Sequence, residues 1–352
     1  MKPNYALALF LVSTIAIASS PAHAWDNPAD RYIDAHRQYM AAECPIAADE
    51  IKNFVYFSRD RELIHGHALL GNARFAGAQI MYSWRDLEPA ENQYDFSAIK
   101  ADVDYLAASG KKLFVQLQDA SFSPNYKAVP EYMLSGEYGG GAVEQYSEDG
   151  AVEGWVAKRW NDKVQARFAA LLTALGQEFN GTIEGINLQE TAIGVSQDTD
   201  PTFTPDRYAD AIKTNMRALK AAFPDTTTMV YANFMPGEWL PFEDEGYLRG
   251  IYEYGNEIGV GLGAPDLMFT KKGQLNHALA MMHEGQYAVP LGIAVQDGNY
   301  IGETGSDRIV KDRKNLVPAL HAFAADFLKV NYMFWVDQKP YFDEDVLPCL
   351  TN

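Results

Sequence analysis

Short apolar segments alternate with longer amphipathic segments along most of this chain, and this alternation limits the possible folds more than any other feature. Eight apolar segments have the length and composition of strands: residues 53–57, 75–84, 111–119, 182–190, 226–234, 259–269, 289–300 and 330–338. Strands that alternate with helices pair in parallel. Eight such units predict an α/β fold, a single-domain (β/α)8 TIM barrel.

An open, doubly wound sheet is the competing arrangement for alternating strands and helices. Such a sheet carries a glycine-rich phosphate turn after its first strand. The segment "FSRDREL" follows the first apolar segment here and contains no glycine. The closed barrel is therefore the favoured architecture.

The segments between the predicted strands have apolar residues at the spacing of amphipathic helices. Helices are expected over residues 94–110, 156–179, 204–224, 244–257, 272–285 and 308–328. The clearest is 156–179, where apolar residues recur every three or four positions from Val156 and Trp160 to Phe179. Residues 120–154 are predicted to form a long loop, rich in glycine and tyrosine. A compact domain rarely keeps such a loop without a use for it, so we expect it to wall a ligand cleft.

The amino-terminal segment is typical of a secretory signal peptide. Lys2 precedes the apolar run "ALALFLVSTIAIA", and "PAHA" ends it with small residues at the positions that a signal peptidase reads. A membrane anchor is the alternative, but the apolar run is short for a span. We expect residues 1–24 to be removed, residues 25–352 to form the barrel, and the protein to be periplasmic or secreted from a bacterium.

The net charge of the chain limits the kinds of partner that it can bind. The formal net charge is −18. Nucleic acids and anionic membrane surfaces require a basic face, so both are excluded as expected partners. The residues His65 and His67 have no further ligands near them in the sequence, and no metal site is expected.

The chain has two cysteines, Cys44 and Cys349, one near each end. Export permits a disulfide. The first and last elements of a closed barrel are neighbours, so a bond between the two ends is geometrically reasonable. Two unpaired thiols are the alternative.

Polar and aromatic residues gather where the predicted strands end. These residues are Trp84, Gln118, Asp119, Gln189, Glu190, Asn233, Asp266, Gln296, Asp297, Trp335 and Asp337. Ligand sites of TIM barrels lie at this end of the strands. Amides and carboxylates bind hydroxyl groups and indoles stack on sugar rings, whereas phosphate would need arginine and lysine. The rim therefore favours a carbohydrate ligand.

The segment "WRDLEPAENQYDFSAI", residues 84–99, resembles the segment that follows the second strand in clan A glycoside hydrolases. The resemblance implies that Glu190, at the end of the fourth strand, is the general acid/base. It also implies that Trp335, at the end of the eighth strand, forms the floor of the sugar site. The family's nucleophile is a Glu at the end of the seventh strand, where this chain has Asp297.

The chain departs from that family at two positions. Gln189 precedes Glu190 where the family has Asn, and Asp297 replaces the expected Glu. Glu303 follows in the next loop and is the second candidate for the nucleophile. Sugar contacts are expected from the remaining rim residues: Trp84, Gln118, Gln189, Asn233, Gln296, Trp335 and Asp337.

The leading hypothesis is an exported, monomeric glycoside hydrolase that cleaves a β-linked saccharide with two carboxyl groups, by retention and without a cofactor. A second hypothesis is a carbohydrate-binding protein on the same barrel that has lost hydrolysis, which the departures at Gln189 and Asp297 motivate. A polysaccharide lyase or transglycosylase using the same carboxylates is a third.

Overall fold

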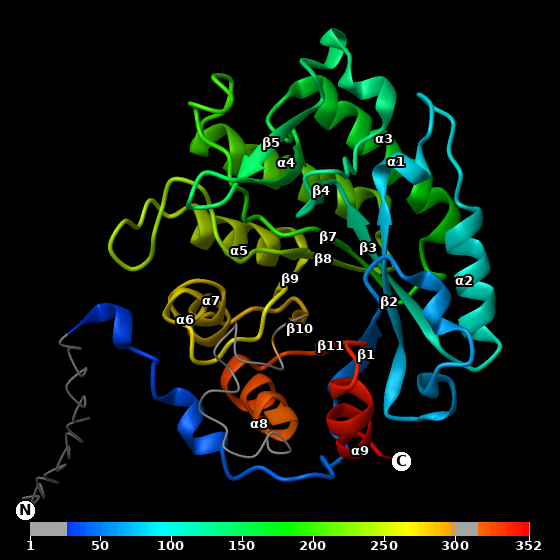
Figure 1. The fold of residues 1–352 in the computed structure, drawn as a ribbon, viewed down its shortest axis with the longest axis vertical. Coiled ribbons are helices and arrows are strands. Elements are labelled where there is room, and N and C mark those ends of the chain that lie inside the picture. The colour runs from blue at the N-terminus through cyan, green and yellow to red at the C-terminus, as the bar shows by residue number, and fades with distance from the viewer. Residues whose placement is uncertain (1–26, 297–298, 300–315, 352) are drawn as a thin grey trace, which may run out of the picture.

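A computed structural model of the chain describes residues 27–296, 299 and 316–351. Eight parallel strands close into a barrel in the order β1-β11-β10-β9-β8-β7-β3-β2, which confirms the predicted TIM barrel (Figure 1). The strands are β1 (Lys52–Tyr56), β2 (Phe75–Ser83), β3 (Lys112–Gln118), β7 (Gly185–Leu188), β8 (Thr227–Tyr231), β9 (Gly261–Ala264), β10 (Leu291–Val295) and β11 (Tyr332–Val336). The catalytic candidates Asp297 and Glu303 lie outside the described residues, as does the expected signal peptide.

Helices surround the barrel (Figure 1). They are α1 (Trp84–Leu87), α2 (Ser97–Ala107), α3 (Asp162–Phe179), α4 (Pro205–Ala222), α5 (Tyr247–Ile258), α6 (Lys272–Asn276), α7 (Ala278–Glu284), α8 (Leu316–Ala322) with a π-helical extension (Phe323–Leu328), and α9 (Leu347–Cys349) after a second π-helical turn (Phe342–Val346). Short 3-10 turns at Arg61–Ile64 and Ala68–Gly71 take the place of a helix between β1 and β2. Among the described residues, no helix is long and apolar enough to cross a membrane.

The structure corrects the prediction for residues 120–160. The expected loop contains an antiparallel sheet of β4 (Ala120–Ser121), β6 (Val152–Ala157) and β5 (Ala142–Tyr146), with 3-10 turns at Glu131–Leu134 and Gly136–Tyr138. Val156 therefore lies in a strand. Helix α3 begins only at Asp162, because the Asn161 side chain caps it by accepting hydrogen bonds from the N–H groups of Lys163 and Val164.

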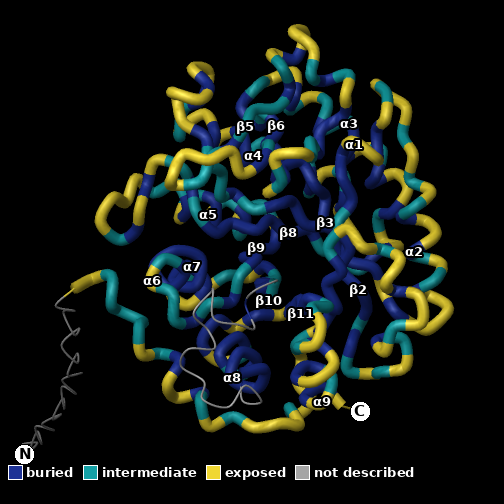
Figure 2. The backbone as a smooth tube through the Cα atoms, in the orientation of Figure 1, coloured by how far each residue is buried: buried dark blue, intermediate teal, exposed yellow. Residues whose placement is uncertain are grey.

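Large side chains on some strands meet small ones on others inside the barrel. The rings of Phe54, Phe114 and Phe334 pack together with centroids 5.0–5.8 Å apart. Glycines on neighbouring strands make room for these rings: a Cβ on Gly292 of β10 would lie only 2.7 Å from the Met229 methyl group and 3.3 Å from the Phe334 ring. The strands are buried along their length (Figure 2). The barrel is thus a packed core, which leaves its mouth for a ligand.

Polar side chains replace aromatic ones nearer the mouth. The amide of Gln79 on β2 donates hydrogen bonds to the Asn187 Oδ1 atom (3.0 Å) and to the Tyr231 hydroxyl (3.1 Å). These three residues join β2, β7 and β8 through the barrel interior. They separate the aromatic core from the residues at the strand ends.

The predicted disulfide between Cys44 and Cys349 is confirmed. The two Cα atoms are 4.6 Å apart, and the Ile46 N–H donates to the Cys349 carbonyl (2.8 Å). The bond joins the segment before β1 to α9 at the end of the chain, across 305 positions of sequence.

We predict that replacing Cys44 with serine lowers the free energy of unfolding by about 2–5 kcal/mol, because the unfolded chain loses its longest covalent constraint. Denaturant unfolding with and without a reductant measures the effect. Cys44→Ser and reduced wild type should then unfold alike, since the chain has no other cysteines. Equal stability of oxidised wild type and the variant would contradict the prediction.

Candidate active site

Glu190 follows β7 and lies half-buried at the carboxyl end of the fourth barrel strand. Its Oε2 atom accepts a hydrogen bond from the Asn233 amide (2.7 Å), and the Asn233 Oδ1 atom accepts one from the Ala192 N–H (3.1 Å). The Thr191 N–H continues the barrel pairing by donating to the Tyr231 carbonyl (2.9 Å). Asn233 therefore joins the segments that follow β7 and β8 and fixes the direction of the Glu190 carboxyl group.

The surroundings of Glu190 favour its protonated form. Burial raises the pKa of Glu190 from 4.5 to about 8, and the carboxylate of Asp266 adds to this shift. The Asn233 hydrogen bond and the Arg159 charge oppose it without cancelling it. Glu190 therefore holds a proton at neutral pH, which is the state that a general acid needs.

A buried ion pair supports the backbone of Glu190. The guanidinium of Arg159 binds both carboxylate oxygens of Asp119, at 2.6 and 2.7 Å. The same guanidinium donates to the Glu190 carbonyl (2.9 Å) and to the Tyr208 hydroxyl (2.7 Å). Arg159 is not a candidate from the sequence, because it lies inside a segment whose spacing predicts a helix. Its position depends on how β6 and α3 divide that segment.

Gln189 is predicted to contact the substrate, but in the structure its side chain binds the backbone. Its Oε1 atom accepts hydrogen bonds from the N–H groups of Asp119 (3.0 Å) and Ala120 (2.7 Å). The side chain is buried and ties the end of β3 to β7. Gln118 is buried nearby with no partner for its Oε1 atom among the described residues.

The two tryptophans predicted to contact sugar are both buried. Trp84 and Trp335 each have 0% of their surface exposed. The Trp84 indole donates to Glu88 (2.8 Å) and the Trp335 indole donates to Asn53 (2.8 Å). Trp335 is next to Phe334, whose ring lies in the barrel core, so strand alternation directs Trp335 outward, towards the helical layer. Neither indole forms a sugar platform.

The remaining predicted residues have different surroundings. Asp337 is buried in ion pairs with Lys339 (2.9 Å) and His67 (3.5 Å).

Asp266 follows β9 and is held through Asn299. The backbone N–H of Gln296 donates to the Asn299 side chain, whose amide donates to Asp266 (3.1 Å). Asp266 is thereby held near Glu190, and burial raises the pKa of its carboxyl group too. Among the described residues, no group of three or more Asp, Glu, His or Cys side chains could hold a metal ion.

A cleft of about 560 Å³ is lined in part by the segments that follow β7 and β8, and we name it the aromatic cleft. It is lined by Phe122, Tyr146, Ser147, Glu148, Glu153, Ala192, Ile193, Gly194, Phe234, Met235, Pro236, Gly237, Glu238 and Trp239. Ala192 and Phe234 directly follow the Thr191 and Asn233 positions described above. Phe122, Tyr146, Ser147, Glu148 and Glu153 of the lining come from the 120–154 segment.

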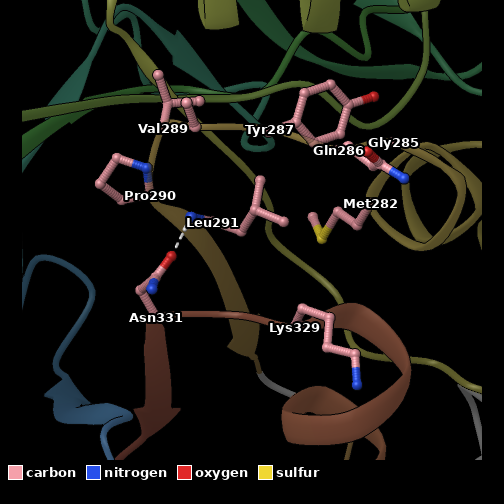
Figure 3. A pocket seen from close by; sticks show the side chains of 10 residues that line it. Met282, Gly285, Gln286, Tyr287, Val289, Pro290, Leu291, Lys329 and Asn331 are labelled. Atoms are coloured by element: carbon pink, nitrogen blue, oxygen red, sulfur yellow. Dashed lines mark hydrogen bonds between the residues drawn. The ribbon is translucent and has the colours of Figure 1, made fainter.

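A second cavity, of about 390 Å³, lies at the other end of the barrel (Figure 3). Its residues Tyr287, Val289 and Leu291 lead into β10, and Lys329 and Asn331 lead into β11. The Asn331 side chain accepts a hydrogen bond from the Leu291 N–H (2.8 Å). This cavity is at the amino ends of the strands, away from the carboxyl ends where the ligand sites of TIM barrels lie.

Comparison with solved structures places the fold. The catalytic domain of a β-amylase from Paenibacillus polymyxa matches with a TM-score of 0.55 and 10% identity, over 82% of this chain and 93% of that chain. A GH5_18 protein from Streptomyces cattleya, in complex with GlcNAc, matches with a TM-score of 0.52 and 12% identity, over 85% and 73%. GH5_18 from Bifidobacterium longum matches with a TM-score of 0.52 and 11% identity, over 82% and 70%.

This chain shares the TIM-barrel fold of solved glycoside hydrolases. The identities are low, so the likeness concerns the fold. No family model matches the chain, and no curated protein sequence matches it.

We predict that Glu190→Gln removes a pH dependence of stability. The pKa of Glu190 is 4.5 in the unfolded chain and about 8 in the folded one, so the folded state holds the extra proton between these values. Stability should therefore fall as pH rises from 4.5 to 8 and stay low above 8. Melting temperatures of wild type and variant across this range measure the difference.

A matched variant controls for the loss of one negative charge. Glu257 is exposed on α5, away from the barrel mouth. The melting temperature of Glu257→Gln should follow the wild-type curve. Parallel curves for wild type and Glu190→Gln would show that Glu190 titrates at its ordinary pKa.

Proposed function

We propose that this chain is an exported glycoside hydrolase that cleaves a β-linked polysaccharide or oligosaccharide with Glu190 as general acid/base. The observation that carries the proposal is the place of Glu190: at the carboxyl end of the fourth barrel strand, aimed by Asn233, and two residues before Ala192 in the lining of the aromatic cleft. The raised pKa of Glu190, caused mainly by burial, agrees with this role.

Glu190 has two tasks in this mechanism. Its proton passes to the glycosidic oxygen as the bond to the anomeric carbon breaks, so the leaving sugar departs as a neutral alcohol. The resulting carboxylate then takes a proton from the incoming water. The Asn233 amide suits the second task, because it donates to the Oε2 atom and stabilises the ionised form.

A second carboxylate completes the proposed reaction. Asp297 is the first candidate and Glu303 the second, as nucleophile or as stabiliser of the positive anomeric centre. In a retaining enzyme this group lies about 5 Å from the general acid. Asp266 contributes in another way, since its carboxylate disfavours a charge on Glu190 before the substrate binds.

Export is part of the proposal. The signal-peptide pattern of residues 1–24 motivates it, and the disulfide supports it because such bonds persist in oxidising compartments. We propose a monomer in the periplasm or outside the cell. Its partner is a carbohydrate, bound without a cofactor through rim residues that include Gln118, Asn233 and Gln296.

A carbohydrate-binding protein without hydrolysis is the second candidate function. The observation that favours it is Asp297, one methylene shorter than the Glu that the resemblance implies. The site chemistry for sugar binding would be the same in both cases. A lyase or transglycosylase would use the same carboxylates and differ in its products.

We predict that Glu190→Gln lowers kcat for polysaccharide hydrolysis by about 10²–10⁴-fold, since the amide has no proton to give to the leaving oxygen. The measurement is the release of reducing ends from a panel of β-linked polysaccharides. Glu184→Gln is a matched control, because Glu184 precedes the same strand at the opposite end of the barrel and contacts Lys52 and Tyr332 there. It should keep wild-type activity.

Three other outcomes would contradict hydrolysis by Glu190. Equal activity of wild type and Glu190→Gln would remove Glu190 from the mechanism. An inert wild type whose melting temperature rises with added sugar would favour the binding protein. Products with an unsaturated end, detected by their ultraviolet absorbance, would indicate a lyase.

A further inference from the structure

Trp239 lines the aromatic cleft and is the exposed indole among the described tryptophans, while Trp84 and Trp335 are fully buried. Half of its surface is exposed (50%), as is half of Phe122 (51%) in the same cleft. An indole exposed to this extent at a cleft wall leaves apolar surface in contact with water, and a ligand that binds in the cleft can cover that surface.

The hidden side of Trp239 is held rigidly. Its ring stacks on Phe234, with centroids 5.8 Å apart and planes within 9° of parallel, and it packs against His277 at 4.9 Å. The backbone N–H groups of Trp239 and Glu243 each donate to the other residue's carbonyl (2.9 Å). Trp239 thus needs little ordering when a ligand binds, which favours affinity.

His277 holds the backbone of Leu240, the residue that follows Trp239. The Leu240 N–H donates to its Nε2 atom (3.0 Å), while its Nδ1 atom lies 2.8 Å from the Gly273 carbonyl. Burial lowers the pKa of His277, so the ring stays neutral with the proton on Nδ1. The histidine thereby acts as a positioning residue for the Trp239 segment.

The cleft is also negatively charged. Glu148 and Glu153 are exposed at its wall, and none of the described residues that line it is a lysine or arginine. The Glu153 carboxylate is close enough to contribute, after burial and Asp266, to the raised pKa of Glu190. The net charge of −18 has the same sign. A ligand with carboxylates would be repelled here.

We infer that the exposed face of Trp239 is the sugar platform of this protein, and that the aromatic cleft selects gluco-configured sugar chains without negative charge, preferring those with amino groups. This inference rests on the proposed function, since it presumes that Glu190 meets a sugar. Equatorial hydroxyls leave a flat face of C–H groups on such rings, which matches the negative face of an indole. An ammonium group gains further attraction from the indole and from Glu148 and Glu153.

Binding to Glu190→Gln protein tests the platform without cleavage of the ligand. Three β-1,4-linked oligosaccharides of equal length differ in charge: cello-oligosaccharide is neutral, chitosan oligosaccharide is cationic, and C6-oxidised cello-oligosaccharide is anionic. Calorimetry at low salt should give affinities in the order cationic, neutral, anionic. Adding Trp239→Ala should weaken binding of the first two by about tenfold.

Phe242→Ala is the matched control for loss of an exposed aromatic ring. Phe242 is 64% exposed in the same segment but does not line the cleft, so this variant should bind like its parent. Replacing Glu148 and Glu153 with glutamine should reduce the preference for the cationic ligand about fivefold or less. Added salt should reduce it in the same direction.

The platform is overturned if Trp239→Ala and Phe242→Ala have equal effects, if none of the three ligands binds, or if the anionic ligand binds most tightly. Its failure is separable from failure of the proposed function. Hydrolysis by wild type with an unchanged affinity in Trp239→Ala refutes the platform alone. An inert wild type whose binding depends on Trp239 refutes hydrolysis alone.

Discussion

The packing of aromatic rings inside the closed barrel governs the rest of this structure. Phe54, Phe114 and Phe334 fill the interior, and glycines such as Gly185 and Gly292 make room for them. No ligand can enter a core packed in this way, so chemistry is confined to the strand ends. The layer of Gln79, Asn187 and Tyr231 marks the transition from apolar interior to polar rim.

The rim itself is stabilised by interactions that become costly if one partner is missing. Arg159 and Asp119 are both nearly fully buried, so either charge alone would lack compensation for its desolvation. Because Arg159 also holds the Glu190 carbonyl, the same pair fixes the candidate acid. Gln189 adds a connection to β3 through two backbone N–H groups. The candidate site is therefore preorganised by buried polar contacts, which is what general acid catalysis requires.

The sequence allowed the barrel, the disulfide and the place of Glu190 to be predicted, because each depends on local pattern or on the order of elements. Side-chain directions were harder. Trp335 and Phe334 are neighbours in one strand, and a register set by tertiary pairing decides which of them faces inward. The sequence pattern does not identify Arg159 as a site residue, because apolar spacing continues from β6 into α3. Trp239 lies in a connection with no periodic pattern, and only the folded arrangement brings it into one cleft with the segment that follows Glu190.

The bond between Cys44 and Cys349 makes the chain almost a covalent ring, since it links the segment before the first barrel strand to the last helix. The ring comprises residues 44–349 and includes all eight barrel strands, so no barrel strand lies on a free end of the chain. A single protease cut in a surface connection, such as the segment that carries β5, would leave both pieces attached to each other. The closeness of Cys44 and Cys349 means that new termini could be opened elsewhere if these two positions were joined by a short linker. A covalently closed barrel can therefore survive damage that would separate an open one.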